Sequence, residues 1–398
     1  MGSFKDNRFI IYHSGRFNNF KIGLAIFISN YIIKESRRLN NYMITQDQVF
    51  INSSIWNTFT EEQTNEYIDL VFSYYRQQGF PYYPTDTDSR LKEFKKLLNY
   101  DSNNIITYEE NKLCYKQVMH GLSLAWSYFP HSWSIPCNNF RTPMQAFEDD
   151  TIFRKVIQKR LKTGTYMSDS GIRKMLKIYS GNQCVSNFRP TTAEAIYNKY
   201  ATNGTVWDMS SGFGGRLLGF IVSNAKKYIG TEPSTKTYNG LNELSHDYKE
   251  IYPKCSSVDL FFNQIYKPSK EIEIYKIGSE DYIPDKESLD FCFTSPPYFD
   301  TEKYSDERTQ SYKKYPDIDI WTECFLKKTF ENCYRGLKQG KYMMINIANT
   351  KSYRDLEKRT VKTAIEVGFK LIDTQYYLLS SISHKTKFKY EPIFVFIK

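Results

Sequence analysis

The run Thr294-Ser295-Pro296-Pro297-Tyr298 carries the most specific candidate chemistry in this sequence. Two prolines remove two backbone donors and stiffen the chain, so the polar residue before them and the aromatic residue after them are held in place. The Ser295 hydroxyl and the Pro296 carbonyl are suited to accept hydrogen bonds from an aromatic amino group. Such a nitrogen is a poor nucleophile because its lone pair is conjugated with the ring. Acceptors beside it favour the pyramidal, nucleophilic form and stabilise the developing charge.

Tyr298 is expected to stack on the base that carries this amino group, and such stacking contributes about 1–3 kcal/mol per base. The chemistry needs neither a covalent intermediate nor a metal ion. Taken alone, the same run is also explained as a Pro-Pro strand terminator followed by a core aromatic residue. Its position relative to the other polar residues therefore decides between the two interpretations.

A glycine-rich loop, Asp208-Met209-Ser210-Ser211-Gly212-Phe213-Gly214, follows an expected strand at 205–208 and precedes an expected helix at 213–223. Glycines at such a junction let the backbone turn tightly and approach a ligand closely. Asp208 is a fixed anion suited to a ligand ammonium group. The pattern DxxxGxG differs from the GxGxxG dinucleotide fingerprint and from the phosphate-binding GK[ST] loop. A purely structural turn is the alternative.

Acidic residues follow the next two expected strands. Glu232 follows the strand at 227–230, where a carboxylate can accept both hydroxyls of a ribose. Glu280 and Asp281 follow the strand at 272–277, where an acid can receive the amino group of adenine, although a solvated acidic turn is the alternative. In open parallel sheets, ligands bind outside the carboxyl ends of the strands, and the unusual residues of this sequence fall at those ends.

Residues 186–398 are expected to form an α/β domain, because short apolar strands alternate with helical stretches. The expected strands are 205–208, 227–230, 272–277, 289–294, 342–348, 369–377 and 392–397. The expected helices are 213–223, 235–249, 321–337 and 356–367. This alternation indicates a parallel sheet with helices on both faces. The last two strands have no helix between them, so one of them should run antiparallel.

Residues 1–185 are expected to form a mainly helical N-terminal region, because apolar residues recur there at helical spacing. The clearest helical segments are 61–77, 88–98, 116–128 and 151–161. The apolar run 22–33 is interrupted by Ser29 and Asn30 and is too short to span a bilayer. A buried helix is expected there instead.

The composition is that of an ordinary globular chain, with 40% apolar and 25% charged residues in a length of 398. A formal net charge of +10 suits a polyanionic partner such as nucleic acid. The seven cysteines show no CxxC spacing and there are five histidines. Neither a disulfide framework nor a Cys/His zinc site is therefore expected, and the thiols fit a reducing cytoplasm.

Together, these motifs resemble the amino-group DNA methyltransferases, which methylate N4 of cytosine or N6 of adenine with S-adenosylmethionine (AdoMet). The shared pattern is DxxxGxG after a first strand, an acid after the second, an acidic turn after the third and [DNST]PP[YFW] after the fourth. The resemblance covers about 186–398. It implies the class I, Rossmann-like fold, with a seven-stranded mixed sheet whose last strand is antiparallel beside the sixth. Tyr390–Phe396 is similar to that last strand, and Asn187–Thr191 is similar to an extra cofactor-contacting motif.

The resemblance also implies residue roles. The implied cofactor contacts are Phe188, Pro190, Thr191, Asp208, Ser210, Gly212, Gly214, Glu232, Glu280, Asp281 and Thr294. Among these, Asp208 and the two glycines would hold the methionine part, Glu232 the ribose, and Glu280 or Asp281 the adenine. The residues implied to hold and activate the target base are Ser295, Pro296, Pro297 and Tyr298.

Two departures from the family pattern matter. No recognition region lies between the glycine loop and the Pro-Pro run, so target recognition is expected from the N-terminal region, from the loop Asp300–Asp319, or from a partner such as a cognate restriction or specificity subunit. The loop carries residues suited to a flipped or single-stranded base, namely Lys303, Tyr304, Arg308, Tyr312, Lys313, Lys314 and Tyr315. Serine before the prolines is more similar to the cytosine-specific members than to the adenine-specific ones, which more often carry Asp or Asn.

Three other functions are open to the same residues. Pro136-Cys137 resembles the Pro-Cys nucleophile of cytosine carbon-5 methyltransferases, but it precedes the cofactor motif, so Cys137 is interpreted as structural. An amino-group methyltransferase acting on RNA or on protein glutamine would share the cofactor end. A degenerate methyltransferase fold could serve as a nucleic-acid-binding module, which would not bind the cofactor. DNA is the expected partner, the cytoplasm is the expected location, and no membrane association is expected.

Overall fold

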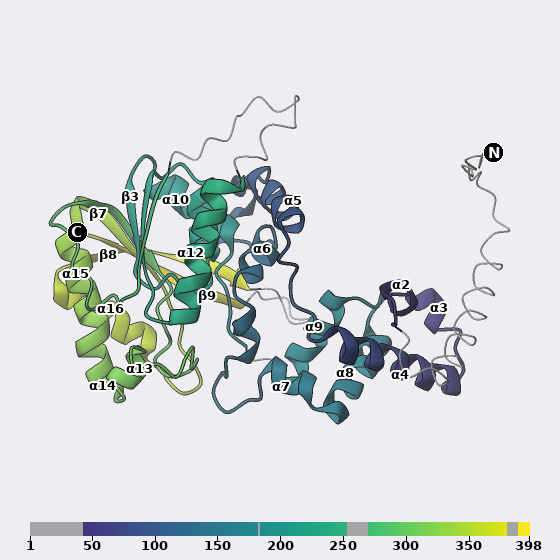
Figure 1. Cartoon of the computed structure of the whole chain (residues 1–398). Coiled ribbons are helices and arrows are strands. Elements are labelled where there is room, and N and C mark those ends of the chain that lie inside the picture. The colour runs from purple at the N-terminus through teal and green to yellow at the C-terminus, as the bar shows by residue number, and fades with distance from the viewer. Residues whose placement is uncertain (1–42, 182–183, 253–269, 380–388) are drawn as a thin grey trace, which may run out of the picture. The chain divides into compact units, whose positions relative to one another are not determined.

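The computed structural model describes residues 43–181, 184–252, 270–379 and 389–398, which divide into two compact units (Figure 1). The larger unit contains 82–143 and 180–398, and the smaller one contains 144–179 and the chain up to Pro81. This division differs from the expected one at residue 185, because 82–143 belongs to the unit with the sheet. The helix expected at 22–33 lies outside the described residues.

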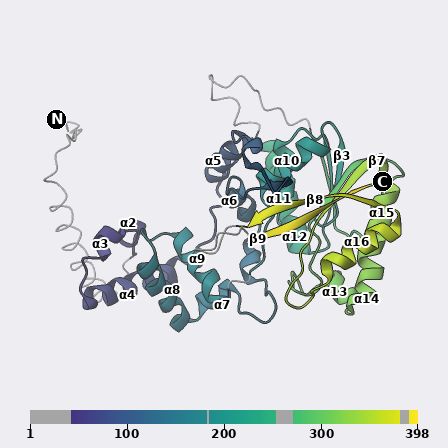
Figure 2. The same ribbon diagram turned by 180° about the vertical axis from the view of Figure 1, so that it is seen from behind.

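A nine-stranded mixed sheet forms the centre of the larger unit in its described part. The strands are β1 (Ile106–Glu109), β2 (Lys112–Tyr115), β3 (Thr205–Asp208), β4 (Lys227–Thr231), β5 (Glu271–Tyr275), β6 (Leu289–Thr294), β7 (Leu337–Asn346), β8 (Lys370–Leu379) and β9 (Lys389–Ile397). Their spatial order is β1-β2-β8-β9-β7-β6-β3-β4-β5. β9 lies between β7 and β8 and is antiparallel to both, and the pair β8–β9 is seen side by side in Figure 2.

Seven of these strands confirm the expected class I methyltransferase topology. The run β5-β4-β3-β6-β7-β9-β8 places the first strand of the series, β3, in the middle and inserts the antiparallel last strand between the fifth and sixth. The expected number of strands was wrong. The hairpin β1–β2 extends the sheet to nine strands, because β2 pairs in parallel with the edge of β8. This hairpin lies in a region that was expected to be mainly helical.

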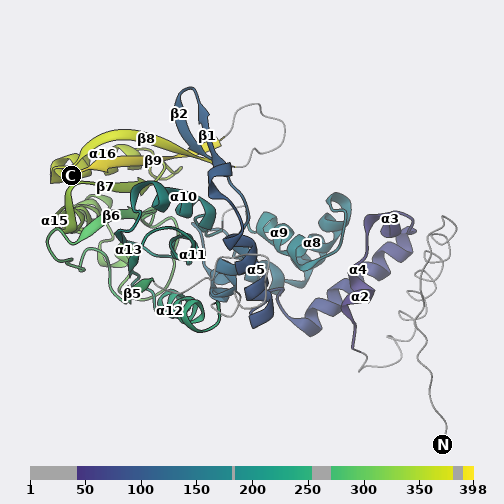
Figure 3. The ribbon, with the colours of Figure 1, turned by 90° about the horizontal axis from the view of Figure 1, so that it is seen from above.

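Helices cover both faces of the sheet, as expected (Figure 3). One face is packed by α5 (Thr87–Leu98), α6 (Leu122–Ser127), α10 (Pro190–Tyr200), α11 (Gly215–Val222) and α12 (Thr235–Glu250). The other is packed by a π-helical turn (Thr322–Lys327), α15 (Lys328–Gly336) and α16 (Leu356–Val367). Successive residues of β3 show the division, because Val206 lies in the first core cluster and Trp207 in the second.

Two expected helices differ in extent from the observed ones. Residues 116–128 were expected to form one helix, but β2 runs to Tyr115 and α6 begins only at Leu122. Gly121, with φ of +76°, forms the N-cap that redirects the chain into the short helix. The helix expected over 321–337 includes the π-helical turn, and its last residue, Leu337, instead begins β7.

The smaller unit is helical in its described residues. Its helices are α2 (Gln46–Val49), α3 (Ser53–Trp56), α4 (Glu61–Gln78), α7 (Pro143–Glu148), α8 (Asp150–Thr163) and α9 (Asp169–Tyr179). Thr60 begins α4 with a capping box to Gln63, and Asp149 caps α8 by accepting from the Ile152 N–H. No helix in the described part of the chain is both long and apolar enough to cross a membrane.

Candidate active site

A cavity of about 850 Å³ opens at the carboxyl ends of the parallel strands of the larger unit. Four of its walls are the segments after β3, β4, β5 and β6, at 209–213, 232–233, 278–280 and 295–298. This is where open α/β sheets bind ligands. Ordinary small-molecule sites measure about 300–1,000 Å³, so this cavity has room for a cofactor and for part of a second ligand.

Nine of the 15 residues singled out in the sequence (four catalytic and 11 cofactor residues) line this cavity. They are Phe188, Ser210, Gly212, Glu232, Glu280, Ser295, Pro296, Pro297 and Tyr298. The six that are not among the lining residues are Pro190, Thr191, Asp208, Gly214, Asp281 and Thr294. The fold therefore brings the Pro-Pro run, the glycine loop and the two carboxylates Glu232 and Glu280 together around one space.

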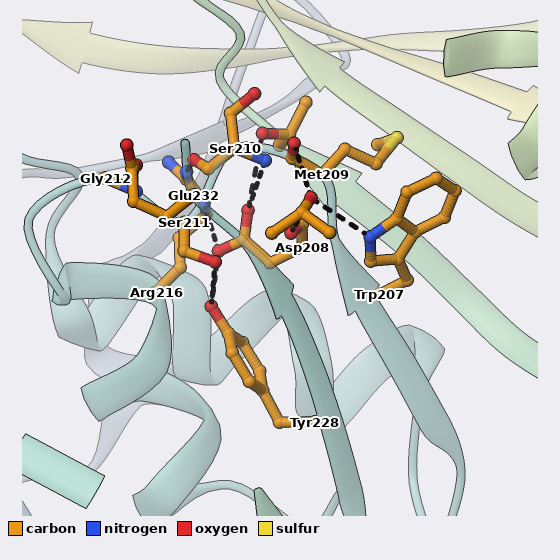
Figure 4. Close-up of polar contacts among 11 residues, drawn as sticks. Trp207, Asp208, Met209, Ser210, Ser211, Gly212, Arg216, Tyr228 and Glu232 are labelled. Carbon is orange, nitrogen blue, oxygen red and sulfur yellow. Dashed lines mark hydrogen bonds and ion pairs between the residues drawn. The ribbon is translucent and has the colours of Figure 1, made fainter. Parts of the chain in front are cut away.

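Asp208 is fully buried behind the glycine loop. Its carboxylate accepts hydrogen bonds from Arg216 Nε at 2.9 Å, from the Tyr228 hydroxyl at 2.8 Å and from the Thr294 hydroxyl at 3.3 Å (Figure 4). These internal donors occupy both carboxylate oxygens. The geometry therefore gives Asp208 and Thr294 a part in organising the loop. Their contact with the cofactor, which the resemblance implies, stays a prediction.

Arg216 was missed in the sequence and lines the cavity. Its guanidinium bridges the Asp208 carboxylate and the Ser210 carbonyl. Burial by itself lowers the pKa of Arg216, but the adjacent Asp208 carboxylate raises it above its usual value. The group is therefore a fixed cation beside the loop. The signal available in the sequence was an arginine directly after the two glycines that end the loop.

Glycine is required where the loop meets α11. Gly214 has φ of +74° and forms the helix N-cap. At Gly215 a Cβ atom would lie 1.9 Å from the Phe188 carbonyl oxygen, so a larger residue does not fit. This contact brings the segment that contains Phe188 against the start of the helix.

The segment 187–191 supports the loop from one side. The Asn187 side-chain amide donates to the Phe213 carbonyl at 2.8 Å. Phe188 lines the cavity and stacks on Tyr377, with ring centroids 5.1 Å apart. Pro190 occupies the first turn of α10, and Thr191 is fully buried beside it. These last two residues hold the helix in place behind the cavity.

Glu232 is positioned by backbone donors. Its two carboxylate oxygens accept from the Gly212 N–H at 3.1 Å and from the Ser234 N–H at 2.9 Å. Burial raises its pKa to about 7, while the two N–H donors act in the opposite direction. The carboxylate joins the end of β4 to the glycine loop and lines the cavity, where its remaining lone pairs can accept from a ligand hydroxyl.

Glu280 has one satisfied and one unsatisfied carboxylate oxygen. Oε1 accepts from Lys314 Nζ at 2.6 Å, whereas the buried Oε2 has no hydrogen-bond partner in the described part of the chain. Burial raises the pKa of Glu280, and Lys314 opposes this increase. Asp281 points to the same lysine, at 2.6 Å, and is half exposed. Only Glu280 of this acidic pair lines the cavity.

The Pro-Pro run forms the opposite wall. Burial raises the pKa of the Tyr298 hydroxyl, while the nearby Ser295 side chain and Ala348 backbone act in the opposite direction. Tyr298 also packs against the second core cluster, the one that contains Trp207. Ser295 and Tyr298 thus line the cavity together.

Two further carboxylates, Glu302 and Glu391, line this end of the cavity. Burial raises the pKa of Glu302, the Tyr304 hydroxyl donates to it, and Glu391 raises its pKa further. Glu302 pairs through its backbone with Cys137, which is itself buried and whose pKa is raised by burial. A buried thiol that is not activated fits the structural interpretation of Cys137.

The loop expected to contact the target is largely satisfied within the protein. Among its residues, Lys313 pairs with Asp306, Lys314 with Glu280 and Asp281, Tyr304 with Glu302, and Tyr312 with the Ser305 carbonyl. Tyr304 and Tyr312 line the cavity. Lys303 and Arg308 are exposed. Tyr315 lies under the Lys314 ammonium group and packs against the second core cluster. The loop is therefore mainly a wall of the cavity, and five of its seven basic and aromatic residues serve internal contacts.

No protein-family model matches the chain, and its sequence matches no curated protein. Several solved structures are similar in fold. An S-adenosylmethionine-dependent methyltransferase of Methanosarcina mazei is 12% identical and matches over 51% of this chain and 96% of that one, with a TM-score of 0.34. M. jannaschii TYW2 in complex with AdoMet is 15% identical over 55% and 80%, with a TM-score of 0.32. The [4+2]-cyclase SpnF is 9% identical over 47% and 60%, with a TM-score of 0.32.

Similarities this distant concern the fold alone. The decisive observation is internal to this chain. A central β3, a parallel run through β7 and an antiparallel β9 inserted beside β8 make the larger unit a class I methyltransferase fold.

Proposed function

We propose that this protein is an AdoMet-dependent methyltransferase that acts on the exocyclic amino group of a DNA base, with cytosine favoured by the serine at 295. The observation that carries the proposal is that Ser295, Pro296 and Tyr298 line the same cavity as the glycine loop and Glu232. β6 pairs in parallel with β3, so the acceptors of the Pro-Pro run lie beside the glycine loop, where an amino group and the cofactor could meet.

The cavity residues fit the cofactor. The buried Oε2 of Glu280 lacks a partner among the described residues and lines the cavity, which supports a contact with the adenine amino group. Glu232 lines the same cavity and would accept from the ribose hydroxyls, and Arg216 is a buried cation suited to the carboxylate of the methionine part. When bound, AdoMet supplies an electrophilic methyl group.

The chain's own residues then act on the target base. The Ser295 hydroxyl and the Pro296 carbonyl accept from the amino group and orient its nitrogen. The Tyr298 ring supplies a stacking surface, and flipping the base out of a duplex costs a few kcal/mol. The amino nitrogen must lose a proton as it becomes alkylated, and the Glu302 or Glu391 carboxylate, both of which line the cavity with Tyr298, would accept it.

The test is methylation of unmodified DNA with and without AdoMet, followed by mass spectrometry of the released nucleosides. We expect N4-methylcytosine, and N6-methyladenine would keep the mechanism but reverse the base preference. Parallel reactions with RNA and with a protein extract identify the other amino-group acceptors. If calorimetry shows that AdoMet binds but none of these reactions gives a methylated product, the protein needs a specificity partner. If AdoMet does not bind, the protein is a degenerate methyltransferase fold that serves as a binding module.

A further inference from the structure

Positive charge is concentrated in one part of the smaller unit, on the neighbouring helices α8 and α9 (Figures 1 and 3). Between residues 154 and 177 the chain has eight lysines and arginines and a single acidic residue, Asp169. The Asp169 carboxylate accepts from the Tyr75 hydroxyl at 2.8 Å. The only acid in this stretch is therefore already used in an internal contact.

The arginines and lysines of this stretch have different surroundings. Arg154 pairs with Asp69, Arg160 Nε donates to the Tyr166 carbonyl at 3.0 Å, and Arg173 donates to the Pro81 carbonyl at 2.8 Å. The arginines are thus part of the unit's own structure. Lys155, Lys159 and Lys162, by contrast, are exposed.

These three lysines lie on one side of α8, because they are separated by four and three residues. They span about 10 Å along the helix. Lys174 adds an exposed cation on α9. We define these four residues as the lysine face. Each strand of a DNA duplex presents a phosphate about every 3.4 Å along the axis, so the α8 lysines match a run of about three phosphates.

We propose that the lysine face binds the phosphate backbone of nucleic acid. This inference extends the proposed function by naming the surface that would hold the substrate, although binding is measured independently of methylation. An anionic membrane is a poorer occupant, because the apolar side of α8 (Phe153, Val156 and Ile157) is completely buried. The helix therefore lacks the exposed apolar face that interfacial membrane helices insert.

The experiment compares the full-length protein with the quadruple variant K155Q/K159Q/K162Q/K174Q by fluorescence anisotropy. The probes are a 30-base-pair DNA duplex, single-stranded DNA and RNA of the same sequence, each titrated over a range of salt concentrations. Each lost phosphate contact should reduce the slope of log affinity against log salt by about 0.9 for duplex DNA and by about 0.7 for single strands. We expect the duplex slope of the variant to fall by about 3.6, because four contacts are lost. The probe with the largest change identifies the preferred nucleic acid.

A matched variant, K92Q/K226Q/K286Q/K370Q, removes four exposed lysines from the larger unit. Its slope of log affinity against log salt should differ from the wild-type slope by less than about 1. The variant K155R/K159R/K162R/K174R should retain binding, because it preserves the charge. An unchanged slope in the glutamine variant, or equal losses in both glutamine variants, would overturn the proposal. Loss of binding to phosphatidylserine vesicles without any change in nucleic-acid affinity would overturn it as well.

The outcomes also separate this inference from the proposed function. If the lysine face binds nucleic acid but the wild-type protein yields no methylated nucleoside, the proposed binding surface is confirmed and the proposed methylation reaction is wrong. If the wild-type protein methylates DNA, and the glutamine variant of the lysine face binds and methylates DNA equally well, the proposed reaction is confirmed and the proposed binding surface is wrong. Thermal unfolding of each variant shows whether the substitutions preserve the fold.

Discussion

The guanidinium of Arg216 donates to the Asp208 carboxylate with 2.9 Å between Nε and Oδ2, and both side chains are almost completely buried, at 5% and 0% exposure. The acid that ends β3 is thus neutralised inside the protein, while the arginine lines the cavity. The acid that the sequence suggests as a ligand contact is therefore paired with a cation that itself lines the cavity. Asp208 acts as a positioning residue for Arg216.

Replacement of Arg216 by methionine should leave the Asp208 carboxylate buried without its cationic partner. Breaking a buried pair from one side typically costs about 3–5 kcal/mol, so we expect a loss of this size in denaturant unfolding. The double variant D208N/R216M removes both charges and should be less destabilised than the sum of the two single variants, with a coupling energy of at least about 1 kcal/mol. Additive effects would mean that the two residues do not stabilise the loop as a pair.

Replacement of Ser295 by alanine should leave AdoMet affinity nearly intact and lower turnover at least about tenfold, because one acceptor for the amino group is lost. Y298A should also lower turnover, since it removes a stacking surface worth about 1–3 kcal/mol. Y298F keeps the ring and isolates the hydroxyl that lies beside Ser295. Calorimetry measures cofactor binding, and single-turnover methylation measures the reaction. Turnover of S295A at the wild-type rate would exclude the proposed role of its hydroxyl.

The alternation of strands and helices in 186–398 could be predicted from this sequence, because it depends on local patterns. The order of the strands is not local, and it followed from the family resemblance. The stretches 289–294 and 356–367 were expected as a strand and a helix, and the structure gives β6 and α16 the same bounds. The hairpin β1–β2 was not predicted. Its strands have four residues each, which is too short for a clear alternation, and their pairing with β8 depends on a contact between residues about 260 apart in the chain.

The residues of the candidate site were predicted where a motif places them at a strand end, as for Glu232 and Ser295. Two kinds of information were beyond the sequence. The first is orientation, because nothing in DxxxGxG shows that the carboxylate of Asp208 turns inward to Arg216. The second is long-range closure. Glu302 and Glu391 meet the Pro-Pro run in the cavity only because the chain after β6 and the start of β9 fold to the same end of the sheet.

The affinity for AdoMet should depend on pH through Glu232. Burial raises the pKa of the Glu232 carboxyl group to about 7. The folded, cofactor-free protein therefore keeps this carboxyl group protonated at pH values where an unfolded glutamate is ionised. As a result, the contribution of Glu232 to the free energy of unfolding falls as pH rises from about 4.5 to 7. Ribose hydroxyls bind best to the ionised carboxylate. Affinity should therefore increase about tenfold between pH 6 and pH 8 and then level off. Calorimetry at several pH values checks this. An equally strong dependence in E232Q would assign the effect to another group.

The ion pair between Lys314 and Glu280 should control the end of the cavity that the proposed function assigns to adenine. In K314M, the Glu280 carboxyl remains buried but loses the cation that opposes the increase in its pKa. More of it is then protonated at neutral pH, so fewer acceptor oxygens are available for the adenine amino group. We expect calorimetry to show an AdoMet affinity about tenfold weaker, since a charged hydrogen bond contributes about 1.5–3 kcal/mol.

The matched control for this substitution is K303M, which removes an exposed lysine from the same loop. It should leave AdoMet affinity unchanged, because Lys303 does not approach Glu280 among the ion pairs of the described residues. Limited proteolysis gives a second measurement. The short helix Ser311–Lys314 is attached to Glu280 and Asp281 through its last residue, so cleavage near it should be faster in K314M than in K303M. Equal affinities and equal cleavage rates in the two variants would show that the ion pair has no part in forming the cofactor site.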